Sequence, residues 1–310
     1  MTGSGPSRFD RSVRRLGVVY REHTPEILAI LDRLRAWATR NGVEVDIEPK
    51  TGRGPESSLD FLDRPVDLVV ALGGDGTFLR ASRLAVGTDI PVLGVNLGRL
   101  GFLTAIPDSE LEEGLDTIVR GEAMLERRFR LRARIEGDYV APRPGDAPLS
   151  DRDFFALNDI VVHATGAARV TPLTLSIGEG EHLEDVGSFG ADGVIVSTPT
   201  GSTAYSMSAG GPIIVPEVEA LVITPVCPHS LAVRPLVVPS HRTVAVASLD
   251  PDADHHVTVD GQVVHQMAPG DRVVVQRDTA PMSLVRMPGQ TFFHTMRRKL
   301  NWAVRPPERA

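Results

Sequence analysis

The feature that most constrains the fold is a buried strand running directly into a glycine-rich turn, in the sequence LVVALGGDGTFLRA at residues 68–81. The run VDLVVAL (66–72) is apolar almost throughout, as expected of a strand buried on both faces of a parallel sheet. The glycines after it permit a close approach of another molecule to the backbone. A helical pattern follows at once, and unpaired N–H groups at a helix N-terminus favour an anion. The stretch therefore predicts a phosphate site, although strand–glycine–helix turns also occur for packing alone.

The first part of the chain repeats this alternation of strand and helix. Further strands are expected at 16–20, 43–47 and 90–96, and helices at about 25–41 and 109–120. Thr24 and Pro25 are expected to begin the first helix and Gly42 to end it. Ser109 and Glu112 match a capping box for the second. The alternation predicts a parallel α/β sheet with helices packed on it.

From about residue 127 the pattern changes to short alternating strands broken by turns. In FRLRARI (129–135) the alternation puts Arg130, Arg132 and Arg134 on one face, and a solvated strand face is favoured over an anion-binding stripe. Asp260-Gly261 separates two alternating runs, which is typical of a hairpin turn. The second half is therefore predicted to be mainly antiparallel β. The tail FFHTMRRKLNWAV (292–304) is expected to form an amphipathic helix that packs back on the first domain.

Composition excludes several classes of protein. The formal net charge of −7 argues against a nucleic-acid-binding protein. No apolar run approaches the roughly 18–20 residues of a membrane span, and the N-terminus lacks the apolar segment of a signal peptide. Cys227 is the only cysteine, so an internal disulfide is impossible and a cytoplasmic protein is expected. Lys50 and Lys299 are the only lysines, and neither is placed to act as the lysine of a P-loop.

Asp75 lies in the middle of the glycine-rich turn, where a carboxylate would repel a bound phosphate. Its presence is explained if it coordinates a metal that bridges phosphates, or if it takes a proton from an attacking hydroxyl. Both roles belong to phosphoryl transfer. A helix N-cap is the structural alternative, because Asp favours that position.

Two other patterns are weighed and set aside. A cluster near the hairpin could be taken for metal ligands: Asp252, Asp254, His255 and His256. Adjacent histidines on a strand point to opposite faces, so a polar hairpin loop is favoured there. The segment GSTAYS does not match Gly-x-Ser-x-Gly, so a hydrolase nucleophile turn is unsupported.

Several segments together resemble one kinase family. GGDGTFLRA (73–81), preceded by an apolar strand, resembles the kinases with a Gly-Gly-Asp-Gly loop, which include NAD kinases, diacylglycerol and sphingosine kinases, and phosphofructokinases. Further segments are similar to those of NAD kinases in particular: NDIVVH (158–163), GADGVIVSTPTGSTAYSMSAGGPI (190–213), PHSLAVRPLV (228–237) and RRKLNW (297–302). The resemblance spans about residues 66–302 in family order, and the chain is identified as a member of the bacterial-type NAD kinase family.

The resemblance implies a two-domain fold and a reaction. An N-terminal α/β Rossmann-like nucleotide-binding domain (1–126), with the tail 287–310 packed on it, would precede a C-terminal β-rich, sandwich-like domain (127–286) that binds NAD, with the active site between them. The expected reaction transfers the γ-phosphate of ATP, or of polyphosphate, to the 2′-hydroxyl of the adenosine ribose of NAD. Mg²⁺ or another divalent cation would be held mainly by the donor phosphates. The implied partners are NAD, the phosphate donor and further copies of the chain in a homodimer or homotetramer, with no nucleic acid and no membrane.

The resemblance also implies site residues. Asp75 would be the general base, and Gly76 would line the site. Asn158 and Asp159 match an Asn-Glu pair that holds the ribose hydroxyls, with Asp one methylene shorter than the usual Glu. Further dinucleotide contacts are implied for Phe102, Arg169, Asp192, Thr200, Thr203, Ala204, Tyr205, Ser206, Met207, Ser208 and Gln262. Within that set, Asp192 matches a residue that reaches a neighbouring subunit's substrate.

One departure from the family pattern and two alternative functions remain. Gly190 stands where many relatives carry Lys or Arg, so a phosphate contact is lost unless Arg80 or Arg169 supplies it, and His229 resembles a residue near the pyrophosphate. A lipid kinase with the same loop would need an apolar groove and would leave residues 190–213 unexplained. A non-catalytic NAD(H)-sensing protein would gain nothing from an acid beside the phosphate, so Asp75 argues against it.

Overall fold

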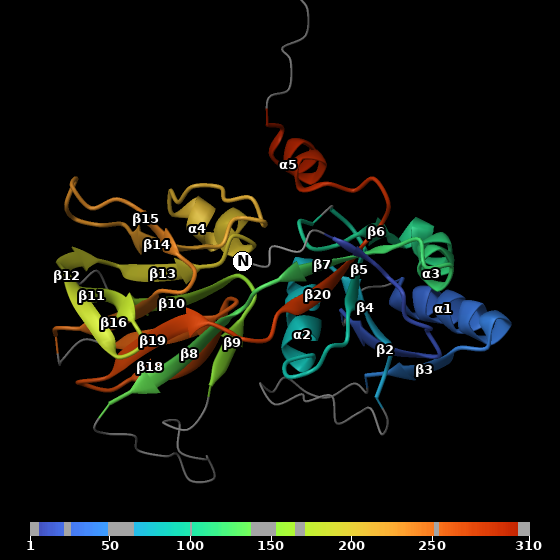
Figure 1. The fold of residues 1–310 in the computed structure, drawn as a ribbon, viewed down its shortest axis with the longest axis horizontal. Coiled ribbons are helices and arrows are strands. Elements are labelled where there is room, and N and C mark those ends of the chain that lie inside the picture. Colours follow the sequence, from blue (N-terminus) through green and yellow to red (C-terminus); the bar gives the residue numbers. More distant parts are fainter. Residues whose placement is uncertain are drawn as a thin grey trace, which may run out of the picture. The chain divides into compact units, whose positions relative to one another are not determined.

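The chain divides into two compact units (Figure 1), described here from a computed structural model that covers residues 6–21, 26–48, 65–99, 101–137, 153–164, 171–250 and 254–302, apart from the side chains of 263 and 264. Unit 1 comprises Met1–Arg128 and Met282–Ala310, and unit 2 comprises Phe129–Pro281. The expected second domain ran to residue 286, whereas Met282–Arg286 forms a strand of the unit 1 sheet. Several residues considered above lie outside the described ranges: Thr24, Pro25, Lys50, Arg169 and Asp252.

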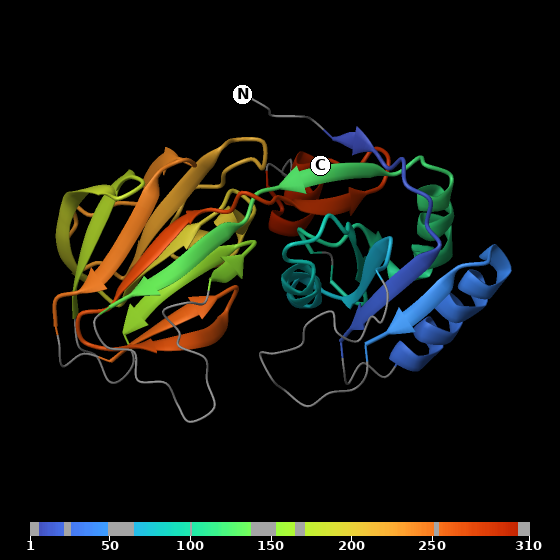
Figure 2. The ribbon, with the colours of Figure 1, turned by 60° about the horizontal axis from the view of Figure 1, so that its bottom comes forward.

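Unit 1 is built on an eight-stranded sheet with the order β1-β7-β20-β5-β4-β2-β3, and β6 pairs with β5 (Figure 2). Its strands are β1 (Ser7–Arg8), β2 (Arg15–Tyr20), β3 (Glu44–Ile47), β4 (Leu68–Gly73), β5 (Val92–Asn96), β6 (Ile106–Pro107), β7 (Met124–Arg128) and β20 (Met282–Arg286). The central pairs β3–β2, β2–β4 and β4–β5 are parallel, whereas β7 pairs antiparallel with β20 and with β1. The predicted parallel α/β sheet is confirmed.

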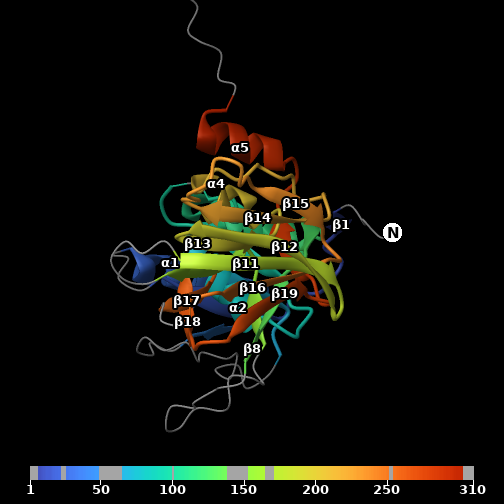
Figure 3. The same cartoon turned by 90° about the vertical axis from the view of Figure 1, so that its left-hand side faces the viewer.

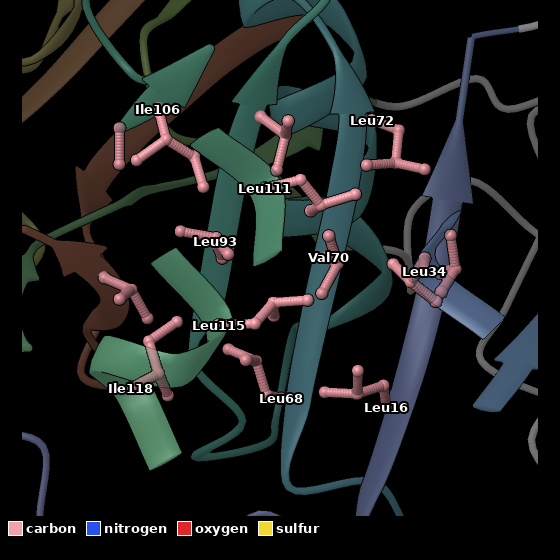
Figure 4. Packing of buried hydrophobic residues seen from close by; sticks show 14 of the residues in the cluster. Leu16, Leu34, Leu68, Val70, Leu72, Leu93, Ile106, Leu111, Leu115 and Ile118 are labelled. Carbon is pink, nitrogen blue, oxygen red and sulfur yellow. The ribbon is translucent and has the colours of Figure 1, made fainter. Parts of the chain in front are cut away.

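Side chains that alternate along β4 point to the two faces of the unit 1 sheet, and helices pack on these faces. Leu68, Val70 and Leu72 of β4 join one core cluster with α1 (Ile27–Asn41) and α3 (Leu111–Val119), as Figure 4 shows for α3. The opposite face is available to α2 (Asp75–Leu84), whose Phe78 packs on β5 so closely that a Cβ on Gly94 would lie 2.9 Å from its ring. Because α2 follows β4 directly, its N-terminus lies at the carboxyl edge of the central strands.

The predicted helix boundaries are partly right. Gly42 ends α1 in the left-handed conformation, with φ of 66°. The capping box is wrong, because Asp108–Glu110 forms a 3-10 turn and α3 begins at Leu111 without a side-chain cap. The Glu112 carboxylate binds the Arg33 guanidinium instead, at 2.9 Å from Nε and 2.5 Å from Nη2. A two-point bond to a guanidinium is stronger than one to a backbone N–H, so it decides where this side chain points.

Unit 2 consists of two six-stranded antiparallel sheets, with orders β15-β14-β13-β10-β17-β18 and β12-β11-β16-β19-β8-β9 (Figure 3). The strands are β8 (Leu131–Glu136), β9 (Phe154–Ala156), β10 (Asp159–Ala164), β11 (Thr171–Glu179), β12 (His182–Ala191), β13 (Gly193–Ser197), β14 (Ala220–Val226), β15 (Leu236–Pro239), β16 (Thr243–Ser248), β17 (His255–Val259), β18 (Gln262–Met267) and β19 (Arg272–Arg277). Inward residues of both sheets, such as Leu131, Val162 and Val246, form one buried cluster. Two sheets around one core make a sandwich, so the predicted β-rich fold is confirmed.

Two local predictions in unit 2 have different outcomes. Asp260 and Gly261 have φ of 48° and 76°, as the predicted hairpin turn requires. Arg130 was expected on a solvated strand face, but it is only 2 % exposed. It precedes β8, and its Nη2 lies 3.1 Å from Asp278 Oδ2. The solvated face therefore holds only Arg132 and Arg134, whose side chains are 38 % and 50 % exposed.

None of the helices in the described ranges is both long enough and apolar enough to cross a bilayer.

Candidate active site

Asp75 is the first residue of α2, and its carboxylate reaches the loop that follows β5. Oδ2 accepts a hydrogen bond from Phe102 N and Oδ1 accepts one from Leu103 N, both at 3.0 Å. Oδ2 also lies 3.2 Å from Nζ of Lys299, on α5 (Phe292–Leu300). The Asp75 side chain is 29 % exposed, so the carboxylate is firmly held but open to solvent.

These contacts exclude the N-cap alternative for Asp75. The N-cap of α2 is Gly74, and no side chain caps this helix. The two N–H groups that Asp75 accepts belong to another loop, 27 and 28 residues away in sequence. The carboxylate therefore joins the glycine-rich turn to the loop at 101–105, and it does not serve as a helix cap.

The donors around Asp75 leave part of its carboxylate free. An ionised carboxylate has about four acceptor positions, two on each oxygen. Among the residues that the structure describes, Phe102 N and the Lys299 ammonium donate to Oδ2, whereas only Leu103 N donates to Oδ1. Gly101 lies directly against this oxygen, since an added Cβ would be 2.0 Å from Oδ1. The remaining acceptor position is therefore on Oδ1.

The three glycines of the turn serve different purposes. A Cβ on Gly73 would lie 2.1 Å from Thr77 Oγ1, so Gly73 is required for packing. A Cβ on Gly74 or Gly76 would meet nothing within 4 Å. These two residues border open space at the start of α2, where a helix presents unpaired N–H groups. The packing and phosphate explanations of the turn thus apply to different glycines.

Phe102 and Arg80 of unit 1 are both engaged within the unit. The Phe102 ring is 8 % exposed and lies 6.1 Å from the Phe292 ring, centroid to centroid. Arg80 Nη1 donates to Glu48 Oε1 at 2.8 Å, and its Nη2 donates to Tyr20 O at 2.7 Å. The Arg80 guanidinium is therefore committed to unit 1, which argues against its use as the substitute phosphate ligand.

In unit 2, a cavity of about 560 Å³ brings together five of the residues expected to bind the dinucleotide. These are Asn158, Asp159, Asp192, Ala204 and Tyr205. They come from the start of β10, from the turn before β13, and from the start of α4 (Tyr205–Ser208). His163, Thr258, Asp260 and Gly261 also line the cavity and were not predicted to do so.

Asp260 anchors the segment that carries Asn158 and Asp159. Its carboxylate accepts hydrogen bonds from the backbone N–H groups of Leu157, Asn158 and Asp159, at 3.1, 2.8 and 3.3 Å. The sequence identified Asp260 only as a turn residue. No local signal shows that a turn side chain reaches a strand about a hundred positions away, so this role was missed.

The same segment is held from its other side by the turn after β13. Thr198 N donates to Asn158 O at 2.9 Å, and Thr198 Oγ1 donates to Leu157 O at 2.6 Å. A Cβ on Gly201 would lie 2.1 Å from Asn158 O. Residues 157–159 are thus fixed between two turns, and only a glycine fits at 201.

The remaining predicted residues of unit 2 are scattered. Thr200 is 7 % exposed, and Ser206 is fully buried with its Oγ 2.8 Å from Thr224 Oγ1. Thr200 and Ser206 are therefore packed beneath the turn that carries them. His229 is exposed, and its backbone N–H donates to Gly190 O at 2.9 Å. The other expected contacts are half-buried or exposed and do not line the cavity: Thr203, Met207, Ser208 and Gln262.

The two adjacent histidines of β17 point in opposite directions, as predicted. His255 is 1 % exposed, with its Nε2 3.1 Å from Thr171 Oγ1. The His256 ring instead lies edge-on to His163 on β10, at 6.0 Å between centroids. The two rings therefore face different neighbours, while Asp252 of the same cluster lies outside the described residues.

Asp159 carries a carboxyl group that is poorly suited to ionise. It is 4 % exposed, and its side chain makes no hydrogen bond to a described residue. Burial, and then the nearby charge of Asp260, raise the pKa of Asp159 from 3.8 to about 7. A carboxyl group near its pKa at neutral pH can donate or accept a hydrogen bond, which suits contact with a sugar diol.

This pKa predicts how stability depends on pH. Between about pH 4 and pH 7 the folded chain keeps a proton on Asp159 that the unfolded chain has lost, so this group makes the free energy of unfolding fall as pH rises. Asp159→Asn removes the charge. We expect it to raise the free energy of unfolding at pH 8 by about 1–2 kcal/mol and to leave it unchanged at pH 4. One pKa unit is worth about 1.4 kcal/mol, but a buried amide still carries part of the cost of burying a polar group. Urea unfolding at both pH values measures this. An equal effect at both would contradict it.

The chain is similar to known proteins over most of its length. A family model for the ATP-NAD kinase N-terminal domain matches residues 55–123, and one for the ATP-NAD kinase C-terminal domain matches 157–287. An NAD kinase of Gemmatimonas aurantiaca is 47 % identical over 242 residues, covering 77 % of this chain and 79 % of its own. One of Heliobacterium modesticaldum is 40 % identical over 290 residues, covering 92 % and 98 %.

Solved structures are similar over nearly the whole chain. An NAD kinase from Archaeoglobus fulgidus, in complex with ATP, has a TM-score of 0.70 at 26 % identity and covers 93 % of this chain and 98 % of its own. A yeast NADH kinase, complexed with NADH, has a TM-score of 0.81, covering 97 % and 91 %. Its identity of 24 % makes it a comparison of fold alone.

The α/β unit with its glycine-rich acidic loop and the β-sandwich unit together define a class of two-domain kinases. Within that class, the chain belongs to the NAD kinase family. The resemblance stated from the sequence is thereby confirmed, as is the prediction of an enzyme, and nothing in the comparisons supports the lipid-kinase alternative.

Proposed function

We propose that this chain transfers the γ-phosphate of ATP to the 2′-hydroxyl of the adenosine ribose of NAD, giving NADP. Family membership supports the overall reaction. The observation that carries the mechanism is the Asp75 carboxylate, held by two backbone N–H groups with an acceptor position left on Oδ1. A fixed, partly exposed carboxylate beside two unobstructed glycines is what a general base for a sugar hydroxyl requires.

The proposed chemical step uses Asp75 as the proton acceptor. Its Oδ1 accepts a hydrogen bond from the 2′-hydroxyl and takes the proton as the ribose oxygen attacks the γ-phosphorus. The O–H bond breaks, a new P–O bond forms, and the bond to the leaving ADP oxygen breaks. Gly74 and Gly76 let the reacting groups approach the start of α2, where the N–H groups stabilise negative charge.

Unit 2 is proposed to bind the dinucleotide. Asn158 and Asp159 bind the ribose hydroxyls with an amide and a carboxyl group, while Ala204 and Tyr205 form the apolar wall of the cavity that receives a base. We retain the other contacts as proposals, namely Gly76, Phe102, Arg169, Asp192, Thr203, Met207, Ser208, Gln262 and His229. Thr200 and Ser206 are proposed to shape the turn from within.

A divalent cation and self-association complete the proposal. A Mg²⁺ ion would be held mainly by the phosphates of the donor, as this cation is in other phosphate-transferring sites. Bound there, the cation would neutralise charge on the transferred phosphoryl group. We also propose a cytoplasmic homodimer or homotetramer, which light scattering on the purified protein would test.

The test of the function is a matrix of phosphate donors and acceptors. ATP or polyphosphate is combined with NAD, NADH, diacylglycerol or sphingosine in the presence of Mg²⁺, and phosphorylated products are quantified. We expect NADP from NAD and ATP. Binding of NAD without any phosphorylated product would favour the sensing alternative instead.

A glycine substitution tests the proposed dinucleotide site. Gly201→Ala places a methyl group 2.1 Å from Asn158 O and 2.4 Å from Asn158 C, so the backbone carrying the ribose ligands must shift. We expect NAD to bind at least about tenfold more weakly, because a small misplacement of positioned groups has effects of this size or larger. Calorimetric titration measures the affinity. The control is Gly98→Ala, because a Cβ at position 98 meets nothing within 4 Å. Equal affinities of the two variants for NAD would refute the assignment of the dinucleotide site to this segment.

A further inference from the structure

Lys299 forms an ion pair with the candidate catalytic carboxylate. Its ammonium lies 3.2 Å from Asp75 Oδ2 and 4.7 Å from the centroid of the Phe102 ring, across which it sits as a cation–π partner. The two partners of the ion pair are 224 positions apart in sequence. The C-terminal helix α5 thus brings a positive charge to the candidate catalytic carboxylate.

The position of Lys299 is set by the packing of α5. Phe292, Met296 and Lys299 follow the spacing i, i+4, i+7, so they occupy one face of the helix. Phe292 packs on Phe102, and Met296 is 7 % exposed. This face of α5 therefore begins with two apolar residues and ends with Lys299, which is exposed, as Arg297 and Arg298 are, but reaches Asp75 with its ammonium.

The loop that receives Lys299 is itself anchored by neighbouring segments. Gln290, just before α5, donates a hydrogen bond from its side chain to Ala105 O. Arg286 of β20 donates from Nη2 to Phe102 O at 3.0 Å. Asp75 binds Phe102 N and Leu103 N of this same loop. The carboxylate and the ammonium therefore both contact one segment that is tied down by several hydrogen bonds.

The choice of lysine is chemically informative in this chain. Only two of its 33 Lys and Arg side chains are lysines. The planar fork of an arginine favours binding both oxygens of a carboxylate, which would cover the open position on Oδ1. An ammonium is a compact charge and can engage Oδ2 alone. A lysine at 299 can therefore hold the carboxylate through Oδ2 without occupying the acceptor position that is left on Oδ1.

We propose that Lys299 is a positioning residue for Asp75: it holds Oδ2, so that Oδ1 is presented to the hydroxyl that becomes phosphorylated. The proposal rests on the proposed function, because it gives Lys299 a role only through the base. It predicts an effect on the chemical step rather than on NAD binding. The fold should not depend on the pair, since partly exposed ion pairs contribute little to stability.

The kinetic test compares Lys299→Met with Arg298→Met, which removes a neighbouring exposed cation from the same helix. We expect Lys299→Met to lower kcat by on the order of 10²-fold, the effect of a misplaced catalytic group, with the KM for NAD changed less than about threefold. Arg298→Met should keep the wild-type kcat. A wild-type kcat for Lys299→Met, or a loss confined to KM, would overturn the proposal.

Chemical rescue distinguishes a positioning role of the Lys299 ammonium from a purely structural role of the side chain. Lys299→Ala leaves space for a small amine, so added ethylammonium should restore part of the lost kcat in a saturable manner. Tetramethylammonium has the same charge but no N–H to donate, and it should restore none. Equal effects of the two cations would show that ionic strength alone is responsible and would overturn the proposal.

A third measurement is independent of activity. Reductive methylation with ¹³C-formaldehyde labels Lys50, Lys299 and the terminal amine while keeping their charges, and Lys299→Arg identifies the Lys299 signal by its loss. Asp75→Asn should shift that signal and Arg298→Met should not. An unmoved signal would refute the contact itself. A shifted signal with an active Asp75→Asn enzyme would instead refute the general-base role and leave the contact standing.

Discussion

Asp75→Asn is expected to leave a folded protein whose kcat is lower by about 10²–10⁴-fold, the usual range for the loss of a general base. The substitution keeps the shape of the side chain and removes its charge and basicity. NAD should still bind, because the proposed ribose contacts belong to residues 158 and 159 of unit 2. Steady-state rates with saturating ATP, together with the KM for NAD, measure both effects.

The same change carries a cost in stability that must be separated from its effect on catalysis. Phe102 N and Leu103 N donate to different oxygens of Asp75, so an amide must turn its NH₂ group toward one of two donors. Leaving one buried donor without a partner costs about 1–3 kcal/mol. We therefore expect a lower unfolding temperature, and the rates should be measured well below it.

The control for this experiment is Asp67→Asn in the same unit. Asp67 also accepts two backbone N–H groups, from Arg14 and Arg15 at 2.8 and 2.9 Å, but both bonds go to one oxygen. An asparagine can keep both bonds there through its own oxygen. It should retain kcat, and a fully active Asp75→Asn enzyme would contradict the assignment of Asp75 as the base.

The sequence predicted those parts of the fold that depend on local pattern. The apolar run before the glycine turn gave a central strand, and the alternating runs after residue 127 gave the antiparallel sandwich. Arg130 shows the limit of this reasoning. The alternating pattern already includes Arg130, but strand β8 begins only at the next residue, so the pattern does not predict where this side chain points. The capping box failed for a related reason, since Glu112 has a better partner in Arg33.

Residues of the candidate site could be predicted where they belong to a sequence motif. Residues that reach the site from distant segments of the chain could not. Asp75 was identified from its unusual place among glycines, and five predicted residues of unit 2 line one cavity. Asp260 and Lys299 were missed because their partners lie about 100 and 224 positions away. Lys299 was considered as a P-loop lysine and as part of the segment RRKLNW. The sequence pattern of the C-terminal helix does not indicate which carboxylate this lysine contacts.

Gly101→Ala is expected to impair catalysis almost as severely, although it removes no polar group. The added methyl would lie 2.0 Å from Asp75 Oδ1 and 2.6 Å from its Cγ, distances that no unaltered structure tolerates. Either the carboxylate rotates or the loop moves, and in both cases the bonds from Phe102 N and Leu103 N are strained. We expect kcat to fall by about 10²-fold, as when a catalytic group is displaced by an ångström.

The loop offers a matched control and a decisive combination for this prediction. Gly98→Ala changes the same residue type three positions earlier, where a Cβ meets nothing within 4 Å, and it should keep kcat within about twofold. In the double variant with Asp75→Asn, the Gly101→Ala change should cost little further activity, because residues that act through one group are not additive. Independent, multiplying losses would show that Gly101→Ala disturbs something other than the carboxylate. Non-additivity would instead show that the close contact between a glycine and one acid oxygen is what keeps the base in place.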